Sequence, residues 1–177
     1  MLSLIDKILD RQALAAIVRE RQAAGAVVVF TNGCFDLLHL GHVRYLQAAR
    51  ALGDLLVVGV NSNASAHALK GAGRPLVPED ERAEVLAALA CVEYVTIFQE
   101  ATAVALVETL RPDVYVKGGD YAASGAAGGF DESRLPEAAP VLAYGGHIRL
   151  IPYLPEHSTT ALIARILARC GGAEGWG

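Results

Sequence analysis

The chain has 177 residues, 53% of them hydrophobic and 6% aromatic, with a net charge of −4, which predicts one domain with a substantial core. Lys and Arg are scattered, no apolar run reaches the roughly 20 residues of a membrane span, and no signal-peptide pattern opens the chain, so we expect a cytoplasmic protein that binds neither nucleic acid nor membrane. The separated cysteines Cys34, Cys91 and Cys170 indicate neither a disulfide framework nor a thiol-rich zinc site.

The apolar pattern predicts helices that alternate with short buried strands along the chain. Asp10 is suited to cap the first helix, which Gly25 ends, and the acidic residues after Pro78 suit the first turn of another. The expected helices cover residues 10–24, about 41–52, 79–89, 102–110 and 158–169. The expected strands cover residues 26–30, 55–60, 92–98, 114–116 and 147–151. This alternation predicts an α/β fold, a Rossmann-like parallel sheet with helices on both faces.

Other segments are expected to lie outside these elements. Residues 61–78 are predicted to form a polar loop with a short helical piece, and the Gly/Ala-rich residues 122–140 a mobile loop. Tails of about residues 1–9 and 170–177 are expected to be frayed. No repeat or linker divides the chain, so residues 1–177 are expected to form a single domain. Ligands of parallel sheets bind outside the carboxyl ends of the strands, so the loops that follow strands carry the candidate site.

A histidine pair follows the first expected strand, in the sequence Thr-Asn-Gly-Cys-Phe-Asp-Leu-Leu-His-Leu-Gly-His over residues 31–42. Gly41 lets an anion approach the backbone closely, and the helix that begins there offers free amides to phosphate. His39 and His42 can donate hydrogen bonds to phosphate oxygens as negative charge builds. The alternatives are two structural histidines or half of a metal site. The position after a buried strand, with glycine between the histidines, favours phosphate binding.

A second phosphate-binding element is predicted at Ser158-Thr159-Thr160, where the last helix begins. Ser158 is suited to be an N-cap, and alone it would indicate only an ordinary cap. As a second helix N-terminus at the same sheet edge, however, it adds capacity for a polyphosphate. The candidate cations are Lys70, Arg82 and Lys117. Lys117 is followed by two glycines and Asp120. The end of this strand therefore combines a cation, two residues whose backbone has no side chain to block a ligand, and a carboxylate.

Several common site motifs do not occur in the sequence. The first strand is not followed by the glycine pattern of dinucleotide-binding oxidoreductases, and no P-loop pattern is present. The nucleophile elbow of α/β-hydrolases is also missing. These absences argue against a dehydrogenase, a P-loop kinase or ATPase, and a hydrolase.

The motifs His39-Leu40-Gly41-His42 and Ser158-Thr159-Thr160, about 115 residues apart, resemble those of the cytidylyltransferase-like nucleotidyltransferases. Within that superfamily, residues 60–65, 70–71, 74–75 and above all 116–121 resemble the heptose 1-phosphate adenylyltransferases. The similarity covers about residues 8–168. Glycerol-phosphate cytidylyltransferases usually have an Arg several residues before the S-T-T motif and lack Lys117, so both differences point away from that branch. Because 177 residues leave no room for a fused sugar kinase, the resemblance is to the stand-alone form, which is what we expect.

The resemblance implies transfer of AMP from ATP to D-glycero-β-D-manno-heptose 1-phosphate, which gives ADP-heptose and pyrophosphate for lipopolysaccharide core biosynthesis. It also implies Mg²⁺ bound mainly through the ATP phosphates, and a homodimer. The implied catalytic residues are His39, His42, Lys70 and Arg82. The implied ATP and sugar-phosphate contacts are Thr31, Asn32, Gly33, Phe35, Asp36, Gly41, Asn61, Lys117, Gly118, Gly119, Asp120, Ser158, Thr159 and Thr160. For Asp36, a structural role in bracing the loop is an equal alternative.

Two other functions are compatible with these residues. One is a cytidylyltransferase that acts on a polyol or amino-alcohol phosphate, and the other is a non-catalytic nucleotide-binding sensor on the same scaffold. A sensor does not need paired histidines at its phosphate site, so His39 and His42 favour catalysis.

Overall fold

Five parallel strands form one sheet in the order β3-β2-β1-β4-β5 in the computed structural model, which describes residues 3, 5–119, 135–152, 154 and 157–170. The strands are β1 (Val28–Gly33), β2 (Leu55–Asn61), β3 (Tyr94–Phe98), β4 (Val114–Gly118) and β5 (His147–Ile151). Every residue of β2 is buried, as expected of a central strand covered on both faces. The predicted Rossmann-like α/β fold is confirmed.

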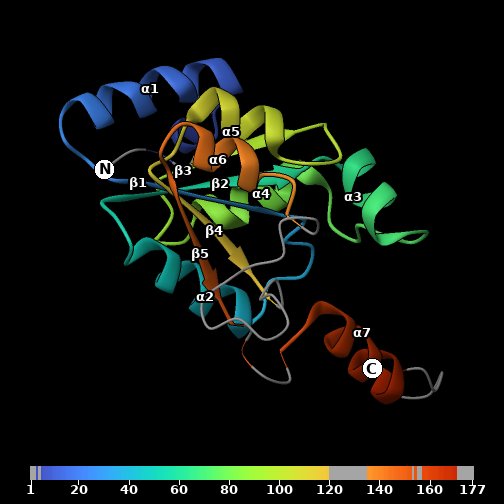
Figure 1. The fold of residues 1–177 in the computed structure, drawn as a ribbon. Coiled ribbons are helices and arrows are strands. Elements are labelled where there is room, and N and C mark those ends of the chain that lie inside the picture. Colours follow the sequence, from blue (N-terminus) through green and yellow to red (C-terminus); the bar gives the residue numbers. More distant parts are fainter. Residues whose placement is uncertain (1–2, 4, 120–134, 153, 155–156, 171–177) are drawn as a thin grey trace, which may run out of the picture.

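Helices cover both faces of this sheet (Figure 1). One face packs against α1 (Arg11–Ala23), α5 (Val104–Leu110) and α6 (Ala138–Ala143). The other face packs against α2 (Leu40–Arg50) and α4 (Glu79–Ala87). The remaining helices are η1 (Ile5–Lys7), α3 (Asn63–Lys70) and α7 (Thr159–Cys170). No helix among these residues is long and apolar enough to cross a membrane.

The predicted helix start at Asp10 is confirmed in atomic detail. Its carboxylate accepts hydrogen bonds from the amides of Gln12 (2.8 Å) and Ala13 (2.9 Å), which have no partner within the helix. Leu14 and Val18 then lie on one side of α1 and are fully buried in the core beside Phe30 and Tyr115. The cap and the apolar stripe together explain why this segment is a helix that packs on the sheet.

The prediction of a frayed tail over residues 1–9 is wrong from residue 5 onward. The Lys7 ammonium donates to the carbonyl of Ala87 (2.9 Å), the last residue of α4, and to that of Val92 (2.8 Å). Ile8 forms a bridge with Val95 of β3. A cation that satisfies carbonyls at the end of a helix is stabilising, and a single Lys gives no sequence signal for it.

The prediction of a mobile loop over residues 122–140 is also wrong at its end, because α6 begins at Ala138. Leu135 is buried in the core, and the buried Glu137 carboxylate accepts a hydrogen bond from the amide of Ala103 (2.8 Å). Residues 122–134 lie outside the described residues. At the C-terminus, Cys170 is the last residue of α7 rather than part of a tail, and residues 171–177 are not described.

The order of the strands defines where a ligand can bind. From β1 the chain proceeds outward to β2 and β3 and then returns to place β4 on the other side of β1. The loops that follow β1 and β4 therefore diverge at the carboxyl edge of the sheet, which is the position of ligand sites in folds of this type.

Candidate active site

The two histidines of the loop after β1 stack against each other at the start of α2. Their ring centroids are 3.9 Å apart with 31° between the ring planes. His39 is the N-cap residue and has extended backbone angles, but its side chain makes no cap hydrogen bond. The ring of Phe35, a residue with a left-handed φ of 47°, meets His42 edge-on at 5.5 Å. The two rings and Phe35 thus pack together at the start of α2, whose N-cap residue makes no side-chain hydrogen bond.

Three ring nitrogens of this imidazole pair (His39 and His42) are buried without a hydrogen-bond partner among the described residues: Nδ1 and Nε2 of His39 and Nδ1 of His42. A buried unsatisfied polar group costs about 1–3 kcal/mol, so three together require a physical reason. Burial lowers the pKa of His42 to about 4, with a smaller contribution from His39. Burial, and then His157, lower the pKa of His39. Two neutral imidazoles at a helix N-terminus can each donate one N–H to an anion.

Gly41 lets the starts of two distant helices meet. A Cβ at this position would lie 3.0 Å from Cβ of His157 and 3.0 Å from ring atoms of His39, closer than side chains normally pack. His157 thus lies beside the imidazole pair, with its ring centroid 6.5 Å from that of His39. The sequence analysis did not select His157 as a site residue, although its position directly before Ser158 was the available signal.

The C-terminal motif reaches the same edge of the sheet. The Ser158 hydroxyl accepts a hydrogen bond from the amide of Ala161 (3.1 Å), so it caps α7 as expected. The Thr159 hydroxyl donates to the carbonyl of Leu37 (3.4 Å) in the loop after β1. Thr160 is exposed in the first turn of the helix. The N-termini of α2 and α7 are therefore neighbours, as the sequence pattern predicts.

The end of β4 contributes a cation beside β1. The Lys117 ammonium donates to Oδ1 of Asn32 (3.1 Å), and the hydroxyl of Tyr115 donates to the same oxygen (2.7 Å). Burial lowers the pKa of Lys117. Gly118 ends the strand, and Gly119 continues with a left-handed φ of 106° that favours glycine. Asp120, also predicted to be a site residue, lies outside the described residues.

Asp36 has a structural role in this structure. Oδ1 accepts from the amides of Leu76 (2.7 Å) and Val77 (3.0 Å), and Oδ2 forms an ion pair with Arg74. Both oxygens are thus committed to the segment between α3 and α4, and only 8% of the residue is exposed. Of the two alternatives for Asp36, these bonds favour the brace.

Arg82 differs from the expectation that it neutralises phosphate. Only 1% of this residue is exposed, and its guanidinium donates to the protein itself. The acceptors are the carbonyls of Val77, Cys34 and Asn61 and the side-chain oxygen of Asn63. These bonds give the predicted phosphate contact no support. They make Arg82, with Asp36 and Arg74, a bracing cluster that ties the loop after β1 to the end of β2 and the start of α4.

The remaining predicted residues surround this arrangement. Thr31 is buried and shares a hydrogen bond with the hydroxyl of Tyr45 (2.6 Å), and Asn61 donates to the hydroxyl of Ser65 (2.9 Å). Gly33 leaves room for the Phe35 ring, which a Cβ would meet at 3.1 Å. Lys70 is exposed at the end of α3, and its charge, like that of Arg82, lowers the pKa of Cys34 against the larger effect of burial. Thr31, Gly33 and Asn61 thus shape the loop, and Lys70 contributes charge near it.

The parallel sheet and the two helix starts at its carboxyl edge define a Rossmann-like nucleotidyltransferase. The family model described as Cytidylyltransferase-like matches residues 30–164, so the chain belongs to this family.

Relatives with the description "Bifunctional protein HldE" include the following two. The one from Syntrophotalea carbinolica is 52% identical, and the one from Trichlorobacter lovleyi is 50% identical, each over 163 residues. Each alignment covers 92% of this chain and 31% of the relative, so the chain spans about a third of the length of these relatives. A crystal structure described as the lipopolysaccharide core biosynthesis protein from Thermoplasma volcanium is also similar, with a TM-score of 0.58 and 28% identity. That match covers 73% of this chain and 98% of that chain.

Proposed function

We propose that this protein transfers AMP from ATP to D-glycero-β-D-manno-heptose 1-phosphate and releases pyrophosphate, forming ADP-heptose for lipopolysaccharide core biosynthesis. The observation that carries the proposal is the neutral imidazole pair, which lies beside two helix N-termini. Its buried nitrogens have no hydrogen-bond partner among the described residues. A triphosphate supplies an acceptor for the one N–H that each neutral imidazole carries. The sequence of residues 116–121, together with the description of the Thermoplasma volcanium neighbour, supports the sugar phosphate as the second substrate.

In the proposed reaction, an oxygen of the sugar phosphate attacks the α-phosphorus of ATP in line. A new P–O bond forms as the bond to the bridging oxygen of the β-phosphate breaks, and pyrophosphate leaves with that electron pair. Catalysis of such transfers is mostly positioning and charge stabilisation. His39 and His42 donate to the α-phosphate oxygens, whereas Ser158, Thr159 and the free amides of α7 hold the β- and γ-phosphates. Lys117 and Lys70 supply positive charge, and Arg82 positions the loop without touching substrate.

Mg²⁺ enters this proposal as a companion of the triphosphate. Within the described part of the chain, no group of three or more His, Cys, Asp or Glu side chains gathers as a metal site. The carboxylate of Asp36 is occupied by Arg74 and two amides. These residues do not form a Mg²⁺ site of their own, so no step above depends on a protein-bound metal.

Pyrophosphate release is the direct test of the proposed function. The purified protein is incubated with Mg²⁺ and either ATP or CTP, against a panel of heptose, hexose, glycerol and amino-alcohol phosphates. We expect release with ATP and heptose 1-phosphate, and a large loss of release in His42→Ala. Activity with CTP and a polyol phosphate, but not with ATP, would assign the cytidylyltransferase alternative. Nucleotide binding without turnover on any substrate would assign the sensor.

We also propose that the protein is a cytoplasmic homodimer, with α7 at the interface. None of the described side chains of α7 is buried, and Ile166 and Leu167 are 47% and 64% exposed. An apolar helix face left open on a small α/β domain is a natural surface for a second copy of the chain. Light scattering should give twice the monomer mass, and Leu167→Glu should halve it. A monomeric mass for the unmodified chain at micromolar concentration would contradict the proposal.

A further inference from the structure

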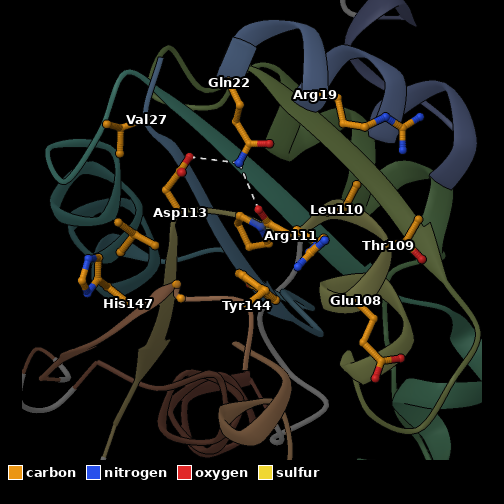
Figure 2. A pocket seen from close by; sticks show the side chains of 14 residues that line it. Arg19, Gln22, Val27, Glu108, Thr109, Leu110, Arg111, Asp113, Tyr144 and His147 are labelled. Atoms are coloured by element: carbon orange, nitrogen blue, oxygen red, sulfur yellow. Dashed lines mark hydrogen bonds between the residues drawn. The ribbon is translucent and has the colours of Figure 1, made fainter. Parts of the chain in front are cut away.

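A cavity lies at the amino edge of the sheet, opposite the edge that carries the candidate active site (Figure 2). Its volume is about 830 Å³, within the range of pockets that bind small molecules. It is bounded by α1, by the end of α5, and by the residues that precede β1, β4 and β5. We call it the amino-edge cavity. None of its lining residues belongs to the imidazole pair, to α7 or to the bracing cluster.

The hydroxyl of Tyr144 is buried in this region and has no hydrogen-bond partner among the described residues. Burial raises the pKa of Tyr144, so the group is a protonated donor at neutral pH. A buried donor without an acceptor is unfavourable, and the usual resolution is a bound water or ligand. Tyr144 thus requires an acceptor that the described chain does not supply.

Arg111 places a cation over the face of the Tyr144 ring. The centre of its guanidinium lies 5.2 Å from the centroid of the Tyr144 ring. Arg111 ends α5 in the left-handed region (φ 47°, ψ 56°), which is strained for a residue with a side chain. Gln22 donates to the carbonyl of Arg111 (2.9 Å) and to Asp113 (3.1 Å), which holds this turn in place (Figure 2).

The charged side chains that line the cavity are two arginines and two carboxylates. Arg111 and Arg19 both line the cavity and are exposed, and neither side chain makes a hydrogen bond in the described chain. Of the two carboxylates in the lining, Asp113 accepts from Gln22 and from the amide of Val28 (2.8 Å), both through Oδ2. Glu108 is exposed. Two arginines and a phenolic hydroxyl together match an oxyanion, because guanidinium groups recognise such groups with paired N–H donors.

We propose that the amino-edge cavity is a second ligand site that binds a small phosphate-bearing anion through Arg111, Arg19 and the hydroxyl of Tyr144. Tyr144 supplies the buried donor, Arg111 the adjacent charge, and Arg19 a second charge from α1. The site is separate from the proposed catalytic site, since one lies at the amino ends of the strands and the other at their carboxyl ends. It therefore does not depend on the proposed reaction.

An amide-resolved NMR titration tests the site in oxyanion-free buffer, with inorganic phosphate, glucose 1-phosphate and acetate as separate probes. The expected result is saturable shifts at Leu110, Arg111 and Gly145 with both phosphates, distinct from any shifts near His42. Acetate should give at least tenfold weaker binding, and equal binding of acetate would overturn the assignment to phosphate. Phosphate shifts confined to the surroundings of His42 would overturn the second site altogether.

Two arginine variants distinguish direct phosphate binding by Arg111 from a general effect of positive charge. Arg111→Gln should weaken phosphate binding at the amino-edge amides about tenfold, whereas Arg21→Gln, an exposed arginine on the same α1 helix as Arg19, should change it less than twofold. Equal effects of the two variants would contradict the proposal.

Tyr144→Phe should act differently on the melting temperature of the free protein and on the rise in melting temperature that phosphate causes. Without phosphate, the variant should melt at the same or a higher temperature, because it removes a buried unpaired hydroxyl. With phosphate present, the ligand-induced rise in melting temperature should be smaller than in the unmodified protein. A variant that melts lower without phosphate and keeps the full rise would mean that the hydroxyl is structural, which would overturn its role in the site.

Discussion

The bracing cluster and the imidazole pair each include a residue of the loop after β1, but their hydrogen bonding differs. Asp36 and Arg82 have protein partners on both carboxylate oxygens and on every guanidinium nitrogen. The buried nitrogens of His39 and Nδ1 of His42 have none in the described chain. The polar groups that the fold satisfies give the loop its shape, whereas the proposed triphosphate would contact the imidazole pair. A cationic side chain close to a candidate phosphate site therefore need not bind phosphate.

The largest effect should come from removing the brace. Arg82→Met keeps much of the buried volume but leaves three main-chain carbonyls without their donor, so we expect about 4 kcal/mol of lost stability. Urea unfolding measures this loss, and Arg21→Met is the control for an exposed arginine. If Arg82→Met is instead as stable as the unmodified protein but loses ATP binding, the guanidinium is a phosphate ligand and the comparison fails.

The next effect concerns pH. The pKa of His42 is about 4 in the folded protein against an ordinary 6.5, so the unfolded chain binds more protons between these values. Stability therefore rises with pH across this window and is lost on acidification, by about 3 kcal/mol from pH 7 to pH 4. Chemical denaturation over this range should show the loss in the unmodified protein and a smaller one in His42→Gln. If the free energy of unfolding falls equally with decreasing pH in both proteins, His42 titrates normally.

Replacing His42 should separate activity from stability. His42→Ala is expected to lower kcat by about 10²-fold or more, roughly 2.7 kcal/mol of transition-state stabilisation, with a smaller effect on ATP affinity. Stability should hold or increase at neutral pH, because an unsatisfied buried nitrogen is removed. Steady-state kinetics and a melting curve check both parts, with the exposed His147→Asn as the control. An unchanged kcat would remove His42 from the proposed mechanism.

The smallest effect should come from Ser158→Ala. Loss of the cap bond to Ala161 costs about 1 kcal/mol of local helix stability. Because no described side chain of α7 is buried, the global melting temperature should change little. If the hydroxyl also holds phosphate, KM for ATP should rise several-fold. A fall in helical content with an unchanged KM would restrict Ser158 to capping.

The order of elements and the edge of the sheet that carries the site could be predicted because they depend on local patterns. The buried β-branched runs predict parallel strands, and the topology of such strands brings His39 and Ser158 to one edge. The partners of Arg82 could not be predicted, because they are carbonyls from separate loops and a carbonyl has no sequence signature. The short α6 was missed because its six residues include Pro140 and give too little periodicity.

The contact between His157 and Gly41 has a thermodynamic consequence. Among the described residues, the attachments of α7 that are resolved lie at its first turn, through Thr159 to Leu37 and through His157 to Gly41. A triphosphate that joins the starts of α2 and α7 would therefore also orient the apolar face proposed for the second subunit. Linkage then makes the two equilibria reciprocal: whatever factor ATP applies to the subunit association constant, association applies to the ATP binding constant.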